Sequence, residues 1–145
     1  MTAIENLTDL RQRRESTVRE HIDSENRHDI EGIIATFHYP RYEVNGEAND
    51  GEDAIRGLLQ ILMRGFPDFW AEILNLRHLD DGILVEGLIT GTHDGEWVGI
   101  PPTGRRISIL VVSIFEFDED RLMCEKAFMD VATMLTQVGV MPQVG

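Results

Sequence analysis

The sequence has 145 residues, enough for a single domain with its own core, and 42% of them are hydrophobic. It carries 13 basic and 26 acidic residues, a formal charge of -13, so nucleic acids and anionic lipid surfaces would be repelled. The first thirty residues hold no apolar stretch typical of a signal peptide. We therefore expect a single-domain, cytoplasmic protein that binds neither nucleic acid nor membrane.

Helical patterns dominate the first half of the chain. Residues 7–26 are strongly charged and free of Pro and Gly, and sparse apolar positions predict a helix with a narrow buried stripe. A second helix is expected over 29–37, before Pro40. A short strand at 42–44 precedes an Asn-Gly turn, and 52–65 carries the apolar face of a third helix.

The second half changes to strand-like patterns. Acidic tips at 80–82 and 118–120 indicate antiparallel hairpins between the strands. A final helical segment around 133–138 stops at Gly139. The predicted strands are 69–79, 83–93, 106–117 and 122–130.

The last two strands can be placed in register if the acidic tip closes their hairpin. Phe117 then lies opposite Leu122, and Ile109 opposite Asp130. One predicted face holds Ile109, Val111, Ser113, Phe115, Phe117, Cys124, Phe128 and Asp130. The other holds Leu110, Val112, Ile114, Met123, Ala127 and Met129. Because both faces are apolar, we expect the second to be covered by another copy in a homodimer.

One long segment carries a family resemblance. The stretch from Gly91 to Arg106, GTHDGEWVGIPPTGRR, closely resembles the loop and following strand of the SnoaL-like polyketide cyclases. Other short segments that fit are Asn26-Arg27-His28-Asp29, Phe66-Pro67-Asp68 and Gln137-Val138-Gly139. The resemblance spans about residues 7–139. It implies the α+β fold of nuclear transport factor 2, a cone-shaped barrel in which a curved, mainly antiparallel sheet wraps around N-terminal helices.

The resemblance also implies a chemistry. Similar proteins close a ring in aromatic polyketides by intramolecular aldol condensation without cofactor or metal, using an Asp at the end of the last strand. Asp130 matches that position. Many relatives read Glu-His-Trp on the last strand, where this chain has Glu125-Lys126-Ala127. A binding module without catalysis, and an isomerase or hydrolase of the same fold, therefore stay open as alternatives.

Two residues are the candidate catalytic groups. Asp130 follows an apolar strand face, where burial among aromatic rings would raise its pKa into a useful range; the alternative is a helix cap. His93 precedes the signature loop and could stabilise an enolate, or could simply anchor the loop. We expect a small apolar or aromatic ligand. The predicted lining of its pocket is Phe37, His38, Phe66, Trp97, Ser113, Phe115 and Phe128.

Metal chemistry has little support. Cys124 is the only cysteine, so an internal disulfide and a cysteine-rich metal site are excluded. His21, Glu25 and His28 have spacing that would align three ligands on an unbroken helix, but the helix is charged all round and ends near Asn26. We interpret these three residues as a solvated helix face and expect no metal.

Overall fold

The computed structural model describes residues 2–141. Within that range the chain forms helices and strands in an α+β arrangement. In chain order they are α1 (Ala3–Asn26), α2 (Ile30–Ala35), β1 (Arg41–Val44), β2 (Glu47–Asp50), α3 (Glu52–Gly65), β3 (Trp70–Leu79), β4 (Gly82–Thr92), β5 (Arg106–Asp118), β6 (Arg121–Met129) and α4 (Val131–Gln137).

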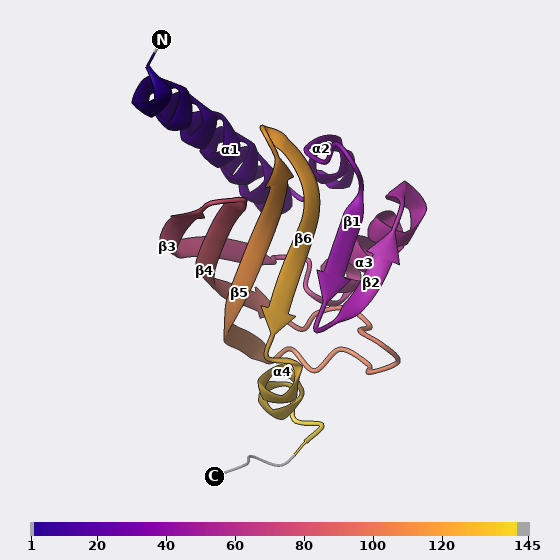
Figure 1. Cartoon of the computed structure of the whole chain (residues 1–145). Coiled ribbons are helices and arrows are strands. Elements are labelled where there is room, and N and C mark those ends of the chain that lie inside the picture. The colour runs from indigo at the N-terminus through magenta and orange to yellow at the C-terminus, as the bar shows by residue number, and fades with distance from the viewer. Residues whose placement is uncertain (1, 142–145) are drawn as a thin grey trace.

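The strands form one curved sheet of six, in the order β2-β1-β6-β5-β4-β3. Neighbouring strands are antiparallel except β1 and β6, which run parallel. Figure 1 shows the sheet wrapping around α1, α2 and α3, with α4 beyond the end of β6. The predicted fold class is thus confirmed: helices fill the concave side of a curved sheet.

Every predicted helix and strand is present, with ends that differ by up to four residues, and β2 is an additional strand that was not predicted. Asn45 and Gly46 have φ values of 50° and 88°, the two positive angles of a tight hairpin turn, and β2 follows directly. Because β2 is largely exposed and lacks the apolar alternation that marks a half-buried strand, the sequence pattern did not reveal it.

Helix α1 is fixed at several points. Thr2 caps its start in a reciprocal pair with Glu5. Halfway along, the buried Arg14 donates to the backbone oxygens of Asp80 and Glu119, at the tips of two hairpins. At its end, the Asn26 side chain bonds both the N–H and the C=O of Ala71 on β3. The C-terminal half of α1 therefore has a fixed position over the sheet. None of the helices between residues 2 and 141 has the length and apolarity needed to cross a membrane.

Two apolar clusters fill the inside of the cone. One lies between α1, α2, α3 and the middle of the sheet; its members include Val18, Ile33, Ile55, Ile83 and Phe115. The other lies at the end closed by α4 and the loop before β5; its members include Phe66, Trp97, Ile107 and Met134. Cys124 on β6 is a buried free thiol, and burial raises its pKa to about 11.

The register of the last hairpin differs from the prediction. Phe117 does lie opposite Leu122, but a bulge follows, so that Glu116 pairs with Cys124 and Phe115 with Glu125. One extra residue in β6 moves every later side chain of that strand to the opposite face. The prediction that Phe128 and Asp130 share the inner face with Phe115 is therefore wrong, and Ala127 is buried rather than on the outer face.

Candidate functional site

A cavity of about 50 Å³ lies between α1, α3 and the concave side of the sheet. Most of its walls are apolar, which is typical of small-molecule sites. Its lining includes Ile22, Leu59, Leu62, Val85, Ile89, Val111 and Phe115. The polar side chains in the lining include Glu25, Tyr42, Ser113 and Glu125. Three acids border the cavity; Glu72 is exposed, so Glu25 and Glu125 are the two that are shielded from solvent.

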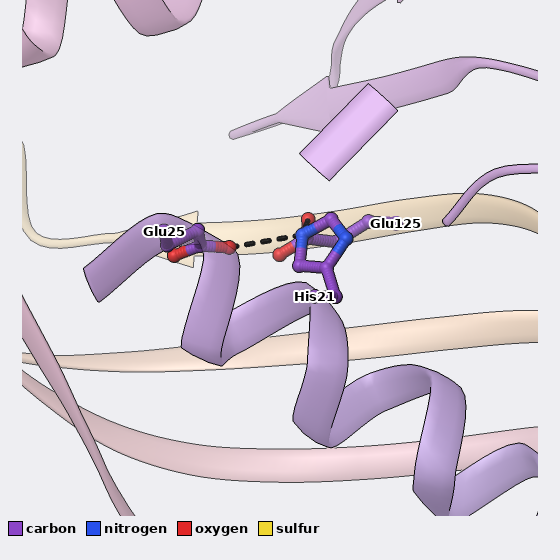
Figure 2. Close-up of side chains that lie close together, drawn as sticks. All are labelled: His21, Glu25 and Glu125. Atoms are coloured by element: carbon purple, nitrogen blue, oxygen red, sulfur yellow. Dashed lines mark ion pairs between the residues drawn. The ribbon is translucent and has the colours of Figure 1, made fainter. Parts of the chain in front are cut away.

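The two acids converge on one histidine. The Nε2 atom of His21 lies 2.9 Å from Oε1 of Glu25, one helical turn further along α1, and 2.9 Å from Oε1 of Glu125 on β6. Figure 2 shows both carboxylates gathered on the same side of the ring. The His21 side chain is 1% exposed and that of Glu125 3%, so the cluster is shielded from solvent.

Burial and charge oppose each other in this cluster. Desolvation disfavours the imidazolium form of His21, but the charge of Glu125 and the contacts with both carboxylates outweigh it and raise the His21 pKa to about 10. Burial raises the pKa of Glu125, while His21 and the Ser113 hydroxyl act against that rise. One Nε2–H cannot point at two acceptors, and Oε1 of Glu125 receives no well-aligned hydrogen bond. The cluster therefore has an acceptor free to take a proton.

Two hydroxyl groups lie beside the acids. Tyr42 on β1 is the sheet neighbour of Glu125. Burial, together with the charges of Glu125 and Glu25, raises the Tyr42 pKa well above its usual value. Its hydroxyl therefore stays protonated and can donate a hydrogen bond. Ser113 on β5 is 8% exposed and lines the same cavity.

An apolar groove of about 210 Å³ adjoins the cavity. It shares Tyr42, Leu59, Leu62 and Met129 with the cavity, and adds side chains from β1, α3, α4 and the loop before β5. These additions include Val44, Leu58, Ile61, Trp97, Val98, Val131 and Met134. Each space is below the roughly 300–1,000 Å³ of typical ligand pockets.

Asp130 lies in a different environment from the predicted one. It is exposed, and its carboxylate accepts bonds from the Thr133 backbone N–H (3.0 Å) and from the Thr133 hydroxyl (2.6 Å). These bonds make it the N-cap of α4 and lower its pKa. The prediction of a buried acid with a raised pKa is wrong at this position, because the bulge in β6 turns Met129, and not its chain neighbours, toward the cavity.

His93 is buried, but at the other end of the cone. Its Nδ1 lies 3.0 Å from the Thr103 hydroxyl, and its ring packs against Phe66 and Trp97. Its backbone C=O accepts from the N–H groups of Thr103 and Gly104. His93 borders neither the cavity nor the groove, so its contacts are those of a residue that anchors the loop. Phe66 likewise lies in the second cluster, whereas Trp97 lines the groove.

The other predicted pocket residues divide into two groups. Ser113 and Phe115 line the cavity, as the alternation of β5 predicted. Phe37 is buried with its ring edge against His21, but it does not border the cavity. His38 is exposed after α2, and Phe128 is 51% exposed, with its side chain on the outer face of the sheet. Those last two expected placements are wrong.

The predicted geometry of the helix histidines is also partly wrong. His28 has φ of 57°, lies outside α1 and contacts the Phe69 carbonyl through Nε2 (2.9 Å). His21 and Glu25 are not a solvated face, because they turn inward to meet Glu125. Atoms of His21, Glu25 and Glu125 that could bind a metal ion lie within 4.8 Å of one another. A cation would have to displace the proton that His21 holds on Nε2.

Glu125 is the residue that sequence reasoning missed. The predicted register placed it on the outer face with Met123, Ala127 and Met129, where only the apolar residues were named. The available signal was one acid among the apolar residues that follow the acidic tip, two residues before Ala127 and four before Met129, the spacing of side chains that share one face of a strand. Only the position of the bulge decides whether those three residues point inward.

Comparison with known proteins agrees with this architecture. The family model of the SnoaL-like polyketide cyclases matches residues 15–138. Among solved structures, AclR from Streptomyces galilaeus has a TM-score of 0.80 at 24% identity, covering 91% of this chain and 84% of AclR. IdmH from Streptomyces antibioticus has a TM-score of 0.73 at 23% identity, covering 87% and 98%. A search of curated proteins finds no match.

Proposed function

Because the chain belongs to the SnoaL-like polyketide cyclase family, we propose that it is a cofactor-independent, cyclase-like enzyme in which Glu125 is the acid/base residue. The substrate would be an aromatic or polycyclic carbonyl compound. The observation that carries this proposal is the pair Glu25 and Glu125, which lines an apolar cavity and meets over a buried histidine. Burial raises the pKa of such an acid, which favours its use in proton exchange.

The proposed reaction balances without any cofactor. The Glu125 carboxylate removes a proton from the carbon next to a substrate carbonyl, leaving an enolate. The enolate carbon attacks a second carbonyl of the same molecule, and a C–C bond forms. The new alkoxide takes the proton back from Glu125 and becomes a hydroxyl. Confinement in the apolar groove would supply much of the acceleration by holding the two carbons close together.

The neighbouring groups have distinct roles in this scheme. The Tyr42 hydroxyl donates to the enolate oxygen, which needs a donor fixed in advance, while the Ser113 hydroxyl supports the Glu125 carboxylate. His21 does not border the cavity and holds the two carboxylates in place from behind. The alternatives are an isomerase that returns the proton to the same substrate skeleton, and a module that binds without turnover.

The test is a screen of aromatic ketones and polyketides for binding and for turnover. Glu125→Gln should lower kcat/KM on the order of 10³-fold, since acid/base catalysis contributes about 10²–10⁴-fold. The matched control, Asp130→Asn, keeps a good helix cap and should act at the parent rate. Turnover by Glu125→Gln at the parent rate would remove Glu125 from the mechanism. Ligands bound without conversion would favour the binding module.

We also propose that the outer face of the sheet pairs with a second copy of the chain. No helix covers this face in Figure 1, and it carries Leu110 (66% exposed), Phe128 (51%) and Leu74 (50%). Sedimentation at micromolar concentration should give a dimer, and Phe128→Glu should weaken it by burying a charge. A folded, soluble parent monomer under these conditions would overturn the proposal.

A further inference from the structure

The hydrogen bonds behind His21 show which of its nitrogens carries a fixed proton. Thr36, at the end of α2, has its hydroxyl oxygen 2.6 Å from the carbonyl oxygen of Ile33 and 2.8 Å from Nδ1 of His21. A carbonyl oxygen can only accept, so the single hydroxyl proton of Thr36 is used on Ile33. The Thr36 oxygen must then accept from Nδ1, which therefore bears a hydrogen.

We propose that Thr36 is a positioning residue that keeps a permanent proton on Nδ1 of His21, so that proton exchange is confined to Nε2, Glu25 and Glu125. With Nδ1–H committed to Thr36, Nε2 faces the two carboxylates in every protonation state of the ring. If Nε2 is protonated, it donates to a carboxylate; if not, it accepts from a carboxylic acid. The proton therefore always moves on the side of the ring that adjoins the cavity.

The packing around the ring supports this one-sided arrangement. The edge-on rings of Phe37 from α2 and Phe115 from β5 have centroids 5.4 and 5.3 Å from that of His21. They hold the imidazole in one orientation and offer no competing acceptor. The titratable groups around the cluster are Glu25 from α1, Glu125 from β6 and Tyr42 from β1, while α2 and β5 contribute Thr36, Phe37, Ser113 and Phe115.

This inference deepens the proposed function, and its catalytic part rests on it. Its first test needs no substrate. Because both ring nitrogens are protonated below the His21 pKa of about 10, the decisive range lies above it. There, nitrogen-15 NMR of the histidine rings should show that the neutral His21 ring of the parent keeps its proton on Nδ1 and has lost the one on Nε2. In Thr36→Val, which keeps the shape but removes the acceptor, the Nδ1–H loses its partner and the pKa of His21 should fall. Thr36→Ser keeps the hydroxyl and should restore the parent titration.

The second test uses turnover, if a substrate is found. Thr36→Val should lower kcat about tenfold with KM within about twofold, since a hydrogen bond to a charged group is worth roughly that factor or more. Thr36→Ser should restore kcat. The matched control is Thr136→Val in α4, because the Thr136 hydroxyl also donates to a backbone carbonyl (Ala132, 3.0 Å) but the structure gives it no bond to a histidine. This control should leave both the His21 titration and kcat unchanged.

The outcomes separate the two proposals. An unprotonated Nδ1 in the parent, or a Thr36→Val protein in which His21 titrates as in the parent, overturns the role of Thr36. If Thr36→Val does not fold, the parent spectrum and Thr36→Ser still decide the matter: Nδ1 must be protonated in both. Protonated Nδ1 in a protein that converts no substrate keeps the inference about Thr36 and removes the proposed enzyme.

Discussion

The molecule contains two fully buried histidines at opposite ends of the cone, and their surroundings differ. His21 is 1% exposed and has a carboxylate on each side of Nε2; His93 is 0% exposed and packs on Phe66 and Trp97. Each ring bonds a threonine hydroxyl through Nδ1, but Nε2 of His93 has no partner. Burial alone therefore does not make an acid/base centre. The partners of the second nitrogen decide whether a proton can be held and exchanged.

The largest expected effect comes from replacing each histidine in turn. His21→Gln should lower turnover at least 100-fold, because Glu25 and Glu125 lose the cation that orients them and then repel each other. His93→Gln should keep kcat within about threefold and cost about 1–3 kcal/mol of stability, as buried substitutions commonly do. Steady-state kinetics and thermal melts measure the two effects. Equal losses of turnover in both variants would contradict this contrast.

A smaller effect should appear in the pH dependence of stability. The His21 pKa rises from an ordinary 6.5 to about 10 on folding, so its stabilisation is complete below pH 6.5 and is lost as pH rises toward 10. The raised pKa of Glu125 acts with the same sign at lower pH. Since one pKa unit corresponds to about 1.4 kcal/mol, the loss should amount to a few kcal/mol.

Urea unfolding at several pH values measures this loss. His21→Gln is the reference, because it lacks the titrating ring but keeps the other ionisable groups of the chain. The difference in unfolding free energy between parent and variant should shrink from pH 6.5 to pH 10. A difference that stays constant over this range would show that His21 is not held protonated by its carboxylates.

The smallest effect is expected from chelation. His21 Nε2 carries a proton between the two acids, and the proposed chemistry requires no cation. EDTA should therefore leave the melting temperature unchanged, and turnover as well. A drop on chelation that zinc reverses would mean that the cluster holds a metal, since metal binding couples directly to stability.

Local patterns in the sequence predicted most of the fold, but not the candidate site. Helix α3 was predicted with its observed bounds, and the inward positions of β5, including Ser113 and Phe115, followed from alternation. Asp130 was predicted as the pocket acid in place of Glu125, because a bulge beside Glu116 shifts the pairing of β6 by one residue. No local preference marks that bulge; it depends on how β6 is held between β1 and β5.

The meeting of His21 with Glu125 could not have been predicted either. Their separation in sequence exceeds one hundred residues, and the side chains that fix α1 across the sheet, Asn26 and Arg14, also bond residues far away in sequence. Spacing along the helix aligned His21, Glu25 and His28, and we interpreted them as a solvated face, whereas His21 and Glu25 turn inward and His28 lies apart from them. The third member of the cluster comes instead from a distant strand.

The rate at which an alkylating reagent labels Cys124 should report how often β6 opens. Its thiol is buried, and its pKa of about 11 keeps it in the unreactive protonated form at neutral pH. An alkylating reagent can therefore reach it as a thiolate only when this part of the sheet opens. Cys124 is the only cysteine and directly precedes Glu125. Its labelling rate therefore measures how often the strand that carries the proposed acid opens. A ligand bound against Glu125 would stabilise the closed state and lower the labelling rate of Cys124, which would reveal binding without any assay of turnover.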